Sequence, residues 1–148
     1  MSTPSRRGFT VALCIATVLA ISGCASANRS AARAAGGTTI GITERDFRVT
    51  ATLAHVSAGA ITLRIHNQGP DQHELIVAPD RSGGMPIRAD GFTVNEEAIQ
   101  SSEPGSITPQ QPGGTEDLAI QLAPGRYELF CNMEGHYMGG MHTLLTVS

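Results

Sequence analysis

The chain of 148 residues contains no lysine, so all ten of its basic residues are arginines. From residue 34 onward, six arginines stand against thirteen aspartates and glutamates, which gives a formal charge of −7. Because phosphate binding needs a positive surface, this balance argues against nucleic acid as a partner. The acidic surface is compatible with electrostatic steering of a basic partner and equally with a plain solvated exterior.

Long apolar runs are also scarce. The mostly apolar run of residues 9–21 is too short for a comfortable membrane span and is typical of the hydrophobic region of an export signal. Arg6 and Arg7 precede it, and a twin-arginine pair in this position predicts export of a folded protein. The following residues 19–24, Leu-Ala-Ile-Ser-Gly-Cys, resemble the lipobox of bacterial lipoproteins, in which the cysteine becomes the lipidated first residue.

We therefore expect a signal peptide over residues 1–23 and a lipid anchor at Cys24. The alternative is an ordinary cleaved signal with an incidental cysteine. Residues 24–37 are small and polar, and we expect them to form a flexible tether to a single domain at residues 38–148. The lipid would hold this domain on the outer face of the cell membrane or facing the periplasm, without spanning the membrane.

Cysteine is the third scarce residue type. Of the three cysteines, Cys14 lies inside the predicted signal and Cys24 at its end, which leaves Cys131 alone in the domain. An exported domain with a single thiol cannot form an internal disulfide, so Cys131 needs another explanation. A metal-bound thiolate is a good one, since the metal would also protect the sulfur from oxidation.

Cys131 opens a glycine-rich stretch in which His136 and Met141 follow at equal steps of five residues. A thiol, an imidazole and a thioether form a soft ligand set, and such sets select copper. On a helix, steps of five residues would rotate each side chain by about 140°, so the three would face different directions. The three glycines at 135, 139 and 140 also argue against a helix. A loop between two strands can instead bring all three side chains to one point.

A fourth ligand is predicted upstream of this loop. Residues 61–66 alternate apolar and polar side chains, as a half-buried strand does, and residues 67–71 form a turn. His73 then begins a second strand, on the same face as Leu75 and Val77, which should point into the core. A histidine at the end of a buried face is well placed to meet a loop at that end of the domain.

Short strand patterns separated by turn residues recur through the domain. We expect strands at 39–43, 47–51, 60–66, 73–77, 115–122, 127–131 and 141–147, a short strand near 92–94 and a helical turn near 96–100. Residues 79–114 are rich in Gly, Pro, Ser and Asp and give the weakest signal. Seven or eight short strands imply an all-β fold, an antiparallel β-sandwich.

The motifs taken together resemble those of the cupredoxins, the blue (type 1) copper domains related to plastocyanin and azurin. The resemblance rests on residues 67–73 (Asn-x-Gly-x-x-x-His), on residues 131–141 (Cys-x4-His-x4-Met) and on the turn and strand of residues 124–131. It covers residues 38–148, and the four-ligand pattern is more specific than any single motif within it.

This resemblance implies a Greek-key β-sandwich that binds one copper ion. His73, Cys131 and His136 would form a trigonal plane around the copper, and Met141 would be a long, weak axial ligand. The backbone N–H of Glu74, next to the first histidine, would point at the cysteine sulfur. Such a protein shuttles single electrons between extracytoplasmic redox proteins.

The remaining histidines and methionines compete poorly as ligands. His66 falls on the polar face of its strand, His142 should point away from its neighbour Met141, and His55 lies in a predicted turn. Met133 and Met138 are alternative axial ligands, but they lie inside the loop, and a position at its rim is favoured. An apolar docking patch is expected around His136 from residues at the rim of the site: Gly69, Pro70, Met138, Gly139 and Gly140.

Three other functions are alternatives to electron transfer. Copper storage or delivery would use the same four ligands, although a delivery protein more often has exposed Met and His clusters. A zinc site is disfavoured by a methionine ligand. Copper reductases and oxidases of this superfamily need further domains and His-x-His pairs, so we expect a monomeric electron carrier and not an enzyme.

Overall fold

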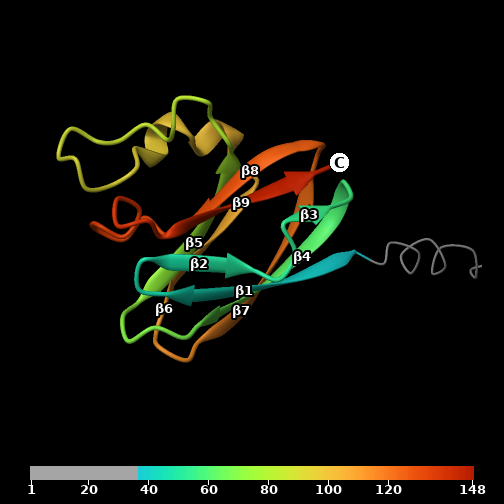
Figure 1. Cartoon of the computed structure of the whole chain (residues 1–148), viewed down its shortest axis with the longest axis horizontal. Helices are drawn as coiled ribbons and strands as arrows, with labels where there is room; N and C mark the ends of the chain where they lie inside the picture. Colours follow the sequence, from blue (N-terminus) through green and yellow to red (C-terminus); the bar gives the residue numbers. More distant parts are fainter. Residues whose placement is uncertain (1–36) are drawn as a thin grey trace, which may run out of the picture. The chain divides into compact units, whose positions relative to one another are not determined.

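Residues 37–148, which the computed structural model describes, form two β-sheets that pack face to face (Figure 1). One sheet has the strand order β2-β1-β4-β7 and the other has the order β3-β9-β8-β5-β6. The strands are β1 Thr38–Arg45, β2 Arg48–Ala51, β3 His55–Val56, β4 Gly59–Asn67, β5 His73–Pro79, β6 Gly105–Gln110, β7 Thr115–Leu122, β8 Gly125–Phe130 and β9 His142–Val147. The predicted signal peptide, the lipidation site Cys24 and nearly all of the tether lie outside the described residues.

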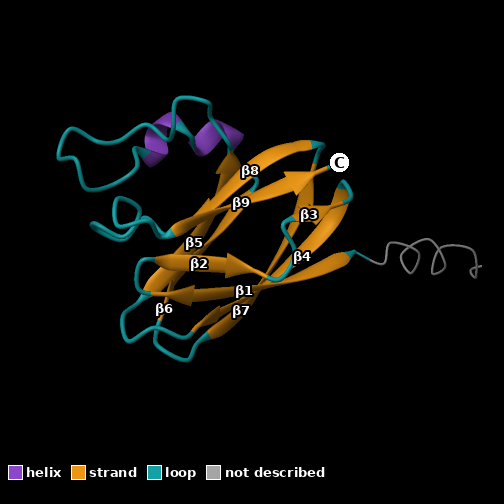
Figure 2. Cartoon of the chain, viewed as in Figure 1, coloured by secondary structure: helices purple, strands orange, loops and turns teal. Residues whose placement is uncertain are grey.

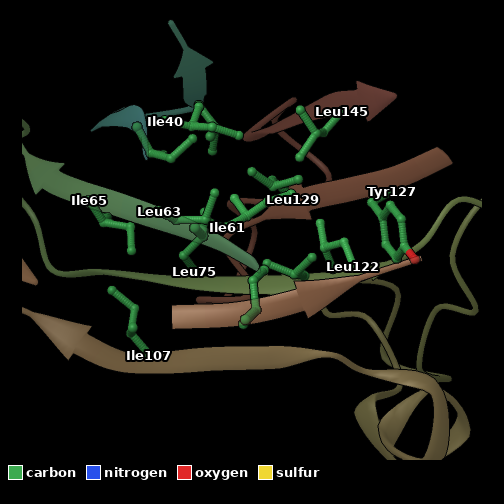
Figure 3. Close-up of a cluster of buried hydrophobic side chains, with 14 of the residues drawn as sticks. Ile40, Ile61, Leu63, Ile65, Leu75, Ile107, Leu122, Tyr127, Leu129 and Leu145 are labelled. Carbon is green, nitrogen blue, oxygen red and sulfur yellow. The ribbon is translucent and has the colours of Figure 1, made fainter. Parts of the chain in front are cut away.

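Side chains that alternate along the strands fill the space between the sheets (Figure 3). Along β4, Ile61, Leu63 and Ile65 are buried, whereas the intervening Arg64 is exposed. The opposing sheet contributes a matching set of inward residues: Leu75, Val77, Tyr127, Leu129, Leu145 and Val147. Each fully buried aliphatic side chain stabilises the fold by roughly 1.5–3 kcal/mol relative to an exposed position. The same alternation therefore fixes which strand residues face inward at the end where β5 begins and β8 ends.

The predicted fold class, a β-sandwich, is confirmed, and several details differ from the expected pattern. Most neighbouring strands are antiparallel, but β1 pairs in parallel with β4, and β3 pairs in parallel with β9. The described residues contain nine strands, two of which, β3 and β6, the sequence patterns did not predict. His55 thus lies in a short strand and not in a turn. Near residue 92, the expected strand is a single bridge between Ile87 and Val94.

The strand β6 explains part of the weak signal in residues 79–114. Its sequence, Gly-Ser-Ile-Thr-Pro-Gln, has one apolar side chain that is buried, Ile107, and a proline at 109. Proline cannot donate to a strand ladder and is tolerated at sheet edges, and β6 is indeed an edge strand. An edge strand that buries one side chain lacks the alternation from which strands are recognised.

Residues 80–104, called the covering segment below, pack on the outer face of the five-stranded sheet. Their buried side chains Met85, Val94 and Ile99 form a second apolar cluster with Ile76 and Phe130 of the sheet. The segment contains two short 3-10 helices, η2 Glu96–Ala98 and η3 Gln100–Ser102, at the position of the expected helical turn (Figure 2). Strands β5 and β8 are therefore buried on both faces. Within residues 37–148, no helix is long and apolar enough to cross a membrane.

Candidate metal centre

Three of the four predicted ligands lie where strands of the second sheet begin or end. His73 is the first residue of β5, Cys131 directly follows β8, and Met141 directly precedes β9. His136 lies in the loop of residues 131–141, called the ligand loop below. The ligand atoms of His73, Cys131 and His136 all lie within 4.8 Å of one another, and these three residues form the metal-binding cluster found among the described residues.

The distances within this cluster fit a bound metal ion. Cys131 Sγ lies 4.0 Å from His73 Nδ1 and 3.5 Å from His136 Nδ1. Donor atoms about 2.0–2.3 Å from one metal ion in a trigonal plane lie about 3.5–4 Å apart. A side-chain arrangement of this size therefore needs little adjustment to hold an ion. Met141 is fully buried in the same apolar cluster as Cys131.

His73 is held in place by a carboxylate from the other sheet. Its Nε2 lies 3.1 Å from Oδ1 of Asp46, in the turn between β1 and β2, while its Nδ1 faces the thiol. A proton on Nε2, donated to the carboxylate, leaves the Nδ1 lone pair free for a metal. Burial, and then the nearby His136, lower the pKa of His73, so the neutral form is favoured. Asp46 thus orients the His73 ring, and the sequence patterns did not predict this contact.

The turn before His73 is fixed by a buried asparagine. Asn67 donates from Nδ2 to the backbone oxygens of Asp71 (2.8 Å) and Gln110 (2.9 Å), and its Oδ1 accepts from the backbone N–H of Gly69 (2.9 Å). A Cβ at Gly69 would lie 2.6 Å from His73 Nε2, so only glycine lets the turn approach the imidazole. Gly69 is buried and does not belong to the surface patch in which we expected it.

The ligand loop is a series of turns, as the glycines predicted. The backbone N–H of Cys131 donates to Met141 O (3.1 Å), and the N–H of Met141 donates to His136 O (3.0 Å). Gly135 and Gly140 have φ angles of 78° and 97°, in the left-handed region that glycine adopts without strain. Backbone hydrogen bonds thus connect three of the four predicted ligands directly.

Cys131 lies in an environment that disfavours a bare thiolate. Burial raises the pKa of its thiol to about 11, and the nearby carboxyls of Glu44 and Glu74 also raise it. The backbone N–H groups of Glu74 and Met133 oppose this effect by hydrogen bonding to the sulfur. The structure therefore has the hydrogen bond from Glu74 that the cupredoxin resemblance implied. A bound cation would replace the thiol proton and stabilise the thiolate.

His136 is partly exposed and is flanked by an aromatic side chain. The ring of Phe47, in the β1–β2 turn, lies 5.5 Å from the His136 ring in an edge-to-face arrangement and packs against Gly139. Phe47 is 54% exposed and has a φ of 60°, which is unusual for a bulky residue. Met138 is 55% exposed on the same loop. No pattern in the sequence around Phe47 predicts that its ring reaches this site.

The other histidines do not belong to the three-residue cluster found among the described residues. His66 Nδ1 is 3.2 Å from Gln68 Nε2, and His142 Nδ1 is 2.8 Å from a carboxylate oxygen of Glu128. His55 is exposed. Met133 is partly buried against the core, whereas Met138 is exposed. Met141 is thus the fully buried methionine of the ligand loop.

The sandwich and its strand pairing define the class: this is the cupredoxin fold. Among solved structures, an auracyanin from Roseiflexus castenholzii covers 76% of this chain and 98% of its own, with a TM-score of 0.56 and 22% identity. Auracyanin A from Chloroflexus aurantiacus, itself a "blue" copper protein, covers 76% of this chain and 100% of its own, with a TM-score of 0.59 and 21% identity.

Rusticyanin from Thiobacillus ferrooxidans is similar at 11% identity, with a TM-score of 0.55; the match covers 76% of this chain and 79% of rusticyanin. No protein-family model and no curated protein matches the sequence. At these identities the similarity establishes the fold, and the function has to be argued from the site.

Proposed function

We propose that this protein binds one copper ion as a type 1 centre and carries single electrons. The observation that carries the proposal is the convergence of two imidazole nitrogens and one thiol sulfur within 4.8 Å, at the end of a rigid β-sandwich. His73, Cys131, His136 and the buried Met141 are the residues that would hold the ion, and this mixed nitrogen and sulfur set suits copper. Bound copper supplies the chemistry by cycling between Cu(II) and Cu(I).

The residues of the chain supply rigidity and access. Asp46 and Asn67 fix the position of His73, and the backbone N–H of Glu74 hydrogen-bonds to the Cys131 sulfur. Ligands that are held in this way move little when an electron is exchanged, which keeps the exchange fast. His136 is the ligand nearest the surface, and the exposed Phe47 beside it gives a partner an apolar surface to dock on.

The partners and the location form part of the same proposal. We infer redox proteins outside the cytoplasm as electron donor and acceptor, and a lipid anchor at Cys24 that keeps the monomer at the membrane. These inferences are supported by the twin-arginine pair, the lipobox-like residues 19–24 and the acidic composition. The sequence contains no His-x-His pair of the kind that copper reductases and oxidases need, which favours an electron carrier over an enzyme.

The visible spectrum of the purified protein after addition of Cu(II) tests the proposal. We expect an intense blue thiolate-to-copper band that reductant bleaches reversibly and that the Cys131→Ser variant lacks. His66→Asn, which changes a histidine outside the cluster, is the matched control and should keep the band. A colourless protein that binds Cu(I) tightly would reject electron transfer and favour copper storage or delivery. Absence of copper binding would mean that the chain has the cupredoxin fold without a copper site.

A further inference from the structure

A buried carboxylate lies on the outer face of β8, on the opposite side of the strand from the metal cluster. Glu128 is 5% exposed, and its Oε1 has two polar neighbours. The hydroxyl of Tyr137 donates a hydrogen bond to it over 3.2 Å, and Nδ1 of His142 lies within ion-pair distance at 2.8 Å. The Tyr137 ring also packs edge-on against Phe130 of the same strand, at a centroid distance of 5.3 Å.

The two residues that contact Glu128 are sequence neighbours of two predicted ligands. Tyr137 directly follows His136, and His142 directly follows Met141. Their rings lie 5.0 Å apart, so both approach Glu128 from the ligand loop and its exit into β9. Each residue that follows one of these two ligands is thus tied by its side chain to one carboxylate.

We propose that Glu128 is a positioning residue that anchors the ligand loop to β8 and so sets where His136 and Met141 lie relative to Cys131. Since successive side chains of an extended chain point to opposite faces, a hold on His142 fixes the direction in which Met141 enters the core. Hydrogen bonds to a buried carboxylate are charge-assisted and roughly twice as strong as neutral ones. The Asn132 side chain ties the other end of the loop to Val94 and Glu96 of the covering segment, whereas Glu128 ties the loop to the sheet itself.

The effect on a bound metal rests on the proposed copper site, whereas the effect on the loop does not. The loop is therefore tested first, by hydrogen exchange of backbone amides in the purified protein without copper. The reporters are the amides of Gly140 and Met141, which donate to Tyr137 O and His136 O. The reference amides are those of β4, in the middle of the four-stranded sheet.

Glu128→Leu removes the acceptor and keeps an apolar side chain of similar size. We expect the reporter amides to exchange at least about tenfold faster, because the hydrogen bond from Tyr137 and the contact with His142 are both lost, while β4 amides keep their rates. Glu128→Gln restores an acceptor oxygen and should recover part of the protection. Glu97→Gln, which removes a charge from an exposed residue, is the control and should change neither set. Unchanged reporter rates, or an equal acceleration in β4, would overturn the proposal.

Two further substitutions remove the contacts of Glu128 by changing Tyr137 and His142, where substitution threatens folding less, and leaving Glu128 itself in place. The double variant Tyr137→Phe/His142→Gln should reproduce the faster exchange of Glu128→Leu. If it does not, Glu128 does not act through these two side chains. In the copper-loaded protein, Glu128→Leu and Glu128→Gln carry the same charge. A difference between their reduction potentials therefore reports ligand position, and equal potentials would restrict the role of Glu128 to the loop. If the wild-type protein binds no copper, the proposed function fails while the exchange rates still decide the anchor.

Discussion

The two histidines of the candidate centre are the same chemical group in opposite surroundings. His73 begins a strand, is fully buried and hydrogen-bonds to Asp46. His136 lies in a loop, is partly exposed and contacts the ring of Phe47. In the proposed copper site, the buried His73 would fix the metal, while His136 at the surface would provide a route for electrons.

Replacing each histidine by glycine tests this comparison most strongly. His73→Gly empties a buried space and leaves Asp46 without its partner, so we expect a loss of about 2–4 kcal/mol in the free energy of unfolding. His136→Gly should cost much less, since its surroundings are partly hydrated. Added imidazole should restore the blue band in His136→Gly, where it can enter from solvent, and not in His73→Gly. Denaturant unfolding and absorption spectra measure both effects, and equal rescue would remove the distinction.

The buried side of the site also contains a carboxyl with no partner. Glu44 is fully buried on β1, neither of its oxygens has a hydrogen bond, and burial raises its pKa from 4.5 to about 7. The folded state therefore binds the proton more tightly than the unfolded state. This contribution to stability is fully present below pH 4.5 and is lost as the pH rises through about 7.

Glu44→Gln should consequently gain stability relative to the wild type as the pH rises. We expect the difference in unfolding free energy to grow by about 3 kcal/mol between pH 4.5 and pH 8, since each unit of pKa shift corresponds to about 1.4 kcal/mol. Denaturant unfolding of the metal-free protein at several pH values measures it. The exposed Glu97→Gln serves as the control, and a difference that does not vary with pH would contradict a neutral Glu44.

Asp46 provides a test that affects one histidine and leaves the other. Asp46→Ala removes the carboxylate that holds His73 Nε2 and does not touch His136. Loss of such an outer partner typically weakens metal binding by about 10–100-fold. Competition with a copper chelator measures this, with Glu97→Ala, a change at an exposed acid outside the cluster, as control. An unchanged affinity would mean that packing alone orients the His73 ring.

The smallest expected effect concerns Phe47 on the exposed side. Phe47→Ala should increase the rate at which a histidine-acylating reagent modifies His136 in the metal-free protein by several-fold, because the ring shields one side of the imidazole. His73 should stay unreactive, since it is fully buried. Mass spectrometry of the modified peptides measures both rates. Equal reactivity of the wild type and the variant would show that the aromatic contact does not limit access.

Part of this arrangement was predictable from the sequence because it depends on local patterns. The alternation around His73 indicated a strand with this residue on the inner face, and the glycines at 135, 139 and 140 indicated a loop. Asp46 and Phe47 were not predictable, because they reach the site across the sandwich and nothing near them in the sequence marks the contact. Asp46 is separated from His73 by 27 positions.

Glu44 shows the limit of the alternation rule. It continues the inward series of Ile40 and Ile42 on β1, so the period of two places it inside. A charged residue at that position is more readily interpreted as the solvated end of a strand, because burying a carboxyl without a partner is costly. At this residue the period of two gives the correct side of the strand, although the burial of a carboxyl is costly.

The covering segment has a consequence for how the molecule behaves in concentrated solution. Met85, Val94 and Ile99 lie over Ile76 and Phe130. Without residues 80–104, these two side chains would form part of an open apolar face on the five-stranded sheet, and such faces bring copies of a chain together. A chain without this segment would therefore be expected to associate with copies of itself, so the segment contributes to colloidal stability as well as to the core.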